Sequence, residues 1–213
     1  MRRLMSRLLL LALCCLPTAL WGAGPESIPS DFAQAIATRL VAEIAKIDQP
    51  QVKVDPAASQ ANGVHVPRKM GALIVPQKDL QESAELAAKF QQPPGAALGV
   101  LFLYNVVPVA QGQKLDASRL RSVTIRDEQG KEHAGHALLL AVRQPAADDY
   151  RLHGYGAGTE PVLEAKFSTG TTTVSGPLVL EVKDAQEATR EGTVVLTVFG
   201  KYQATFRAAY TGD

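Results

Sequence analysis

The change in hydrophobic patterning at residue 95 constrains the fold of this chain more than any other feature of its sequence. Beyond this residue, helical spacing gives way to short runs of β-branched and aromatic residues separated by turn-forming residues, which is typical of strands. Gly99–Val109 and Leu138–Val142 are almost wholly apolar, as expected of strands covered on both faces. The spacing of the turn signals predicts about eight strands and favours an antiparallel β-sandwich over a parallel sheet.

Residues 24–94 carry helix-like segments and only short strand-like runs. From Ser30 to Ile47, apolar residues recur every three or four positions, which predicts an amphipathic helix with Ser30 as its N-cap and Pro50 beyond its end. The apolar stripe of this helix is predicted to consist of Phe32, Ile36, Leu40, Ile44 and Ile47.

A second helix is predicted to begin at Asp79, because Glu82 three residues later completes a capping box, and to end at Pro93-Pro94. We therefore expect an α+β protein, mainly β, in which two N-terminal helices of residues 24–94 pack against a β-sandwich domain of residues 95–213. The number and spacing of the strands resemble those of immunoglobulin-like sandwiches in pattern only, and a fold resemblance of this kind implies nothing about function.

Residues 1–23 are expected to form a secretory signal peptide. The first seven residues are cationic, and Leu8–Leu20 is mostly apolar but shorter than the roughly 20 residues that span a bilayer as a helix. Small residues follow this run, so we expect cleavage near Ala23. Lipid attachment is not expected, because Leu13 rather than a small residue precedes Cys14.

Both cysteines of the chain, Cys14 and Cys15, lie in the expected leader, so the exported chain would contain no disulfide. About 190 residues can bury enough surface to be stable without one. Cysteine nucleophiles, thiolate zinc sites and iron–sulfur clusters are excluded from the exported chain for the same reason. We expect a periplasmic or secreted protein.

The charge balance argues against a general nucleic-acid binder. Three of the 22 basic residues, Arg2, Arg3 and Arg7, lie in the expected leader, which leaves 19 basic residues against 21 acidic ones and a net charge of −2. Neutralising phosphates requires a clear basic excess. No cofactor is expected either, because the sequence has no phosphate-binding loop and no dinucleotide fingerprint.

The histidines are the weak candidates for a metal site. His133 and His136 have acidic neighbours, a composition that can coordinate zinc. Residues three apart on a strand point to opposite faces, so this pair could converge only through a bulge at Gly135. His153 could join the pair only through tertiary pairing. We interpret all three as solvent-facing strand residues and expect no metal.

No catalytic set emerges from the sequence. The paired carboxylates Asp127-Glu128 and Asp148-Asp149 fall in predicted hairpin turns, where such side chains commonly bind the local backbone. Ser175 lacks the strained strand-to-helix turn that activates a serine nucleophile. Five residues that are dispersed in the sequence could still form a hydrolase site in three dimensions: His133, His136, His153, Asp148 and Glu164. Such a site would need two or more of them in one concave pocket.

Two groups of residues are candidates for a protein interface. Arg119, Arg121 and Arg126 form a basic cluster that could bind an acidic partner, although charges on a solvated sheet face also prevent aggregation. Tyr202 and Tyr210 could anchor an interface if both are exposed, because tyrosine is enriched at the centres of contacts. The threonine run that ends at Ser175 would favour assembly by strand addition if it formed an unpaired edge.

These observations favour a non-enzymatic exported binding module that contacts a protein or an envelope polymer. Such a module could be an inhibitor or immunity-type protein, or an accessory subunit of an envelope complex. The alternative is a carbohydrate-active or other hydrolase whose site is assembled only in three dimensions.

Overall fold

The computed structural model describes residues 25–44, 52–54, 60–66, 69–126, 131–170, 174, 176–186 and 189–212. Several predicted features lie outside the described residues: the leader, the end of the first helix, the Asp127-Glu128 turn, the threonine run and Ser175. The side chain of Arg126 lies outside them as well.

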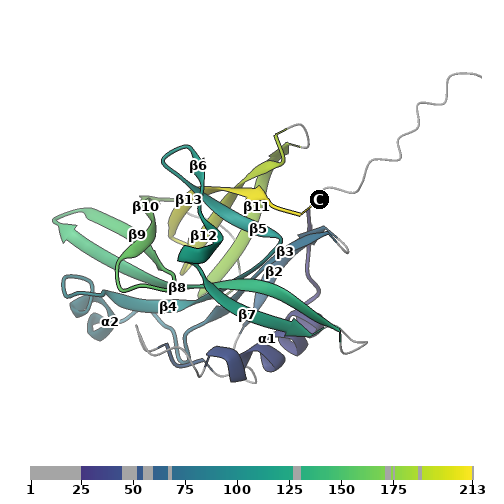
Figure 1. The fold of residues 1–213 in the computed structure, drawn as a ribbon. Helices are drawn as coiled ribbons and strands as arrows, with labels where there is room; N and C mark the ends of the chain where they lie inside the picture. The colour runs from purple at the N-terminus through teal and green to yellow at the C-terminus, as the bar shows by residue number, and fades with distance from the viewer. Residues whose placement is uncertain are drawn as a thin grey trace, which may run out of the picture.

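The protein is mainly β, and its strands pair antiparallel, as the sequence predicts. They form one curled sheet in the order β1-β2-β3-β4-β8-β9-β10-β13-β12-β11, with β7 beside β8, β5 beside β13, and β6 beside β5 (Figure 1). The strands are β1 (Glu26–Ser27), β2 (Asn62–Val66), β3 (Met70–Pro76), β4 (Ala96–Tyr104), β5 (Val106–Ala110), β6 (Gln113–Lys114), β7 (Arg121–Arg126), β8 (Glu132–Ala146), β9 (Asp149–Tyr155), β10 (Pro161–Thr169), β11 (Leu178–Gln186), β12 (Glu191–Val198) and β13 (Tyr202–Tyr210).

Strand β10 connects the two halves of the curled sheet. It pairs with β9 as far as Lys166 and with β13 from Phe167 onwards, so one strand belongs to both halves. The division into two separate sheets, and with it the immunoglobulin-like sandwich, is therefore not confirmed. β3 also pairs with β4, so the strands before and after residue 95 share this sheet.

The side chain of Asn62 joins the two ends of the curl. Its Nδ2 donates to the carbonyl oxygen of Leu178 at 2.8 Å, and its Oδ1 accepts from the backbone N–H of Leu180 at 2.9 Å. An amide side chain on β2 thus pairs with β11 in the manner of a neighbouring strand, because it offers one donor and one acceptor. The contact brings together residues 116 and 118 positions apart in the sequence.

Apolar residues fill both sides of the first half of the sheet. On β8, Leu138 and Leu140 face the interior of the curl, whereas Leu139 and Ala141 face outward, and all four are fully buried. The outward residues belong to a second apolar cluster that includes residues of α1 (Ser30–Ile44). The wholly apolar run of Leu138–Val142 therefore forms a strand covered on both faces, as its composition predicts.

Helix α1 begins at Ser30, as predicted, but the predicted stripe is buried only in part. Ala33, Ala37 and Leu40 are buried against the sheet, Ile36 is half-buried, and Phe32 is 40% exposed. The helix lies against β2, β3 and β7 on the outer face of the sheet (Figure 1). Alanine lacks side-chain bulk beyond Cβ, so this stripe allows a closer approach of helix and sheet than a stripe of large residues.

The second N-terminal helix is not confirmed as predicted, because α2 consists only of Ala84–Ala88. Its N-cap is Ser83, whose hydroxyl accepts from the N–H of Leu86 at 3.1 Å, so the capping box expected at Asp79 does not form. Asp79 instead adopts a left-handed conformation with φ of 56°, which aspartate tolerates in turns. Within the described residues, no helix is both long enough and apolar enough to cross a membrane.

Candidate functional site

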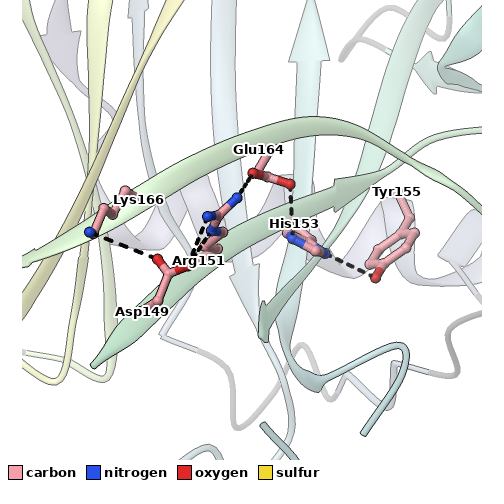
Figure 2. A network of polar contacts seen from close by, with 6 residues as sticks. All are labelled: Asp149, Arg151, His153, Tyr155, Glu164 and Lys166. Carbon is pink, nitrogen blue, oxygen red and sulfur yellow. Dashed lines mark hydrogen bonds and ion pairs between the residues drawn. The ribbon is translucent and has the colours of Figure 1, made fainter. Parts of the chain in front are cut away.

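A polar network lies on the outward face of β9 and β10 (Figure 2). The Arg151 guanidinium donates to both carboxylates beside it, through Nε to Asp149 Oδ2 at 2.9 Å and through Nη1 to Glu164 Oε1. The other oxygen of Glu164 lies 3.3 Å from His153 Nε2. His153 Nδ1 is 3.4 Å from the hydroxyl of Tyr155, which donates to the carbonyl oxygen of Pro94 at 2.9 Å.

The period of two along a strand explains why these residues meet. Asp149, Arg151, His153 and Tyr155 alternate with inward residues on β9, and the register places Glu164 opposite His153. Of the five residues whose convergence would favour a hydrolase, the structure therefore brings together His153 and Glu164. Asp148, His133 and His136 are not part of this network.

Charge and burial shift the pKa values of the network in a consistent way. The hydrogen bond from Arg151 lowers the pKa of Asp149, and the two carboxylates raise the pKa of Arg151. Burial lowers the pKa of His153 more than the nearby Glu164 raises it, and burial raises the pKa of the Tyr155 hydroxyl. Arg151 and Asp149 are thus held in their charged forms, and the ion pairs of Arg151 with Asp149 and Glu164 are best explained as a structural network on a sheet face.

The histidines on β8 do not approach one another. His133 contacts the ring of Tyr104 on the outward side, with ring centroids 5.6 Å apart, whereas His136 pairs in register with Leu103. His153 belongs to the network on β9 and β10 described above. Among the described residues, no group of three or more histidine, cysteine, aspartate or glutamate side chains is arranged to hold a metal ion.

His136 should make stability depend on pH. Burial lowers its pKa in the folded protein, and its Nδ1 has no hydrogen-bond partner among the described residues. The unfolded chain then binds the proton more tightly, so stability falls as the pH drops below the ordinary histidine value of about 6.5. We expect His136→Gln to flatten the dependence of unfolding free energy on pH between about 5 and 7. An unchanged slope in urea titrations at several pH values would contradict this assignment.

A cavity of about 650 Å³ lies inside one end of the curl. Its walls come from β2, the start of β3 and the end of β4 on one side, and from the end of β11, the start of β12 and the end of β13 on the other. The interior of the wall is apolar and includes Val64, Ala72, Leu101, Leu103, Val194 and Ala208. This volume lies within the range of pockets that hold small molecules.

Polar side chains join the apolar wall in lining the cavity. Among the described residues of the lining, Lys69 and Arg190 are basic and Glu191 is acidic. Glu191 forms an ion pair with Arg207, which is not among these lining residues. His65 also lines the cavity, and its Nε2 lies 3.8 Å from Oε1 of Glu26. An apolar pocket with a few polar groups is the usual form of a small-molecule site. None of the five residues proposed for a hydrolase lines this cavity.

The candidate interface residues are dispersed. Tyr202 and Tyr210 stand at opposite ends of β13, roughly 26 Å apart at 3.3 Å per residue, and both are half-buried. Tyr202 packs near Tyr150, whereas Tyr210 lines the cavity. Arg119 is exposed in the 3₁₀ helix η1 (Ala117–Arg119), and Arg121 begins β7 and is half-buried.

Comparison of the chain with protein-family models, with curated protein sequences and with solved structures finds no match.

The cavity was not predicted, although small residues on the strands that line it are a signal for it in the sequence. Ala72, Gly192 and Ala208 are small residues on β3, β12 and β13, and all three line the cavity. Small inward-facing residues leave space inside a curled sheet unless side chains from other strands fill it. Only the pairing of β11–β13 across from β2–β4 shows that this space stays open.

Proposed function

We propose that this chain is an exported, non-enzymatic binding protein that holds a small, largely apolar molecule inside the curled sheet. The 650 Å³ cavity with its apolar wall is the observation that carries this proposal. Export to the periplasm or beyond is supported by the leader-like residues 1–23. The binding module expected from the sequence thereby acquires a specific site, and its ligand is a small molecule rather than a protein or a polymer.

The hydrolase alternative receives less support from the same geometry. His153 and Glu164 meet on an outward face, where Arg151 also binds Glu164. The carboxylate of Glu164 is engaged by both of these partners. Lys166 lies 3.9 Å from Asp149 and completes the network of six residues, none of which is a serine, cysteine or threonine (Figure 2). A base without a neighbouring nucleophile lacks one element of a hydrolytic site.

Binding of a neutral apolar fluorophore, N-phenylnaphthylamine, tests the proposal. We expect saturable binding at one site per chain, and we expect Ala208→Phe to weaken it by about tenfold or more, because the added ring would occupy the cavity. Fluorescence titration measures both affinities, and thermal melting verifies that the variant is folded.

Thr205→Phe is the matched control, since Thr205 lies on the same strand but is exposed and does not line the cavity. Its affinity for the fluorophore should equal that of the unmodified chain. Absence of saturable binding by the unmodified chain, or equal affinities for all three proteins, would overturn the proposed function.

A further inference from the structure

We propose that the natural ligand is an anionic amphiphile, whose carboxylate or phosphate head binds Arg190 while its apolar chain occupies the cavity. This inference rests on the proposed function and adds the chemical class of the ligand. It is carried by the position, the contacts and the charge surroundings of Arg190, which is an exposed member of the cavity lining.

The backbone holds Arg190 firmly at the end of the turn before β12. Its carbonyl oxygen accepts from the N–H of Tyr210 at 2.8 Å, and its φ of 55° is left-handed. A non-glycine residue in this conformation costs energy that the surrounding structure must supply, and such residues cluster at ligand-binding sites. The turn therefore places this side chain at a defined point beside the cavity.

The guanidinium of Arg190 is held in place by the protein but still has N–H groups available to a ligand. Nη1 donates to the carbonyl oxygen of Gly212 at 3.2 Å, and the carbon of the guanidinium lies 5.7 Å from the centre of the Tyr210 ring. A guanidinium carries five N–H donors in a rigid fork. Among the described residues, no carboxylate forms an ion pair with it, so Nε and Nη2 can receive a ligand.

The charges around the cavity favour an anion. The described lining contains one arginine, Arg190, one lysine, Lys69, and one carboxylate, that of Glu191. Glu191 is already neutralised by Arg207. With Glu191 engaged by Arg207, the guanidinium of Arg190 has no carboxylate partner among the described residues of the lining, and an arginine fork matches the geometry of a carboxylate or a phosphate.

The apolar wall determines the rest of the ligand. Leu101, Leu103 and Val194 contribute side chains to the cavity, so burying an alkyl chain there is favourable for every methylene removed from water. A small inorganic anion would leave this wall unoccupied. A neutral hydrocarbon would leave the guanidinium without its counter-charge, so the two parts of the site together select an amphiphile.

Titration calorimetry with four probes tests this inference. Dodecanoate and dodecyl phosphate provide the two head groups on one chain, dodecanol provides the chain without charge, and acetate provides the head without the chain. We expect dodecanoate or dodecyl phosphate to bind about tenfold more tightly than dodecanol, and acetate to show no measurable binding. The better of the two anions identifies the head group.

Arg190→Gln should remove this preference and leave the affinity for dodecanol unchanged, whereas Arg190→Lys should retain part of it. Arg119→Gln is the matched control, because this arginine is exposed and does not line the cavity. Equal affinities for dodecanol and both anions, or a preference that survives in Arg190→Gln, would overturn the head-group assignment while the proposed function stands. Failure of dodecanol and of both anions to bind would instead refute the proposed function.

Discussion

Asn62→Ala is expected to lower the free energy of unfolding by about 2 to 3 kcal/mol. The substitution removes the two hydrogen bonds that join β2 to β11, from Nδ2 to Leu178 and from the N–H of Leu180 to Oδ1. Leu178 and Leu180 are buried, so their backbone groups have little access to water once the amide is gone. An unsatisfied buried donor or acceptor costs roughly 1 to 3 kcal/mol.

The same substitution should weaken ligand binding, because β2 and β11 both contribute walls to the cavity. Chemical denaturation measures the stability, and titration with the neutral fluorophore measures the binding. Gln60→Ala is the control. This exposed residue accepts a hydrogen bond from Asn62 through its backbone carbonyl, which alanine retains. The free energy of unfolding of this variant should therefore differ from that of the unmodified chain by less than about 0.5 kcal/mol. If Asn62→Ala proves as stable as Gln60→Ala, the side-chain amide does not hold the two ends of the sheet together.

Local patterning in the sequence was sufficient to predict the strand-rich class. Leu138–Val142 has no polar residue to place in solvent, and the structure covers it with the interior of the curl on one face and the cluster containing α1 on the other. The start of α1 at Ser30 was also predictable, since the boundary depends on neighbouring residues alone.

The buried face of α1 was predicted correctly at Leu40 but wrongly at Phe32, for a physical reason. Hydropathy ranks Phe32 above Ala33, but contact with a sheet also depends on how closely the helix can approach. The structure buries Ala33 and Ala37 and leaves Phe32 exposed. Size, and not only polarity, thus decided which stripe faces the core.

The closure of the curl and the cavity depend on contacts between distant parts of the chain. Asn62 reaches residues more than 110 positions away, and nothing near it in the sequence indicates that its amide replaces a strand. The meeting of His153 with Glu164 likewise depends on the register between β9 and β10. Pattern analysis identifies strands, but their order and register follow from tertiary packing.

Gly63→Ala should lower the free energy of unfolding by about 3 kcal/mol or more. Gly63 lies opposite Leu73 in the register of β2 and β3. A Cβ at this position would penetrate the carbonyl oxygen of Ala72 and lie 2.9 Å from the Cα of Leu73. Both are backbone atoms in a paired strand, so relief requires moving the strand rather than turning a side chain.

Gly71→Ala supplies the matched control on the neighbouring strand. A Cβ there would meet the Cβ of His65 and the carbonyl oxygen of Val64 at 3.5 Å, which is ordinary van der Waals contact. The two variants differ only in the space available, so urea denaturation should show a large loss for Gly63→Ala and a change below about 1 kcal/mol for Gly71→Ala. Equal stabilities would mean that β2 and β3 are not packed as closely as the structure shows. A selective loss would establish that the close pairing of β2 with β3 tolerates no added atom at Gly63.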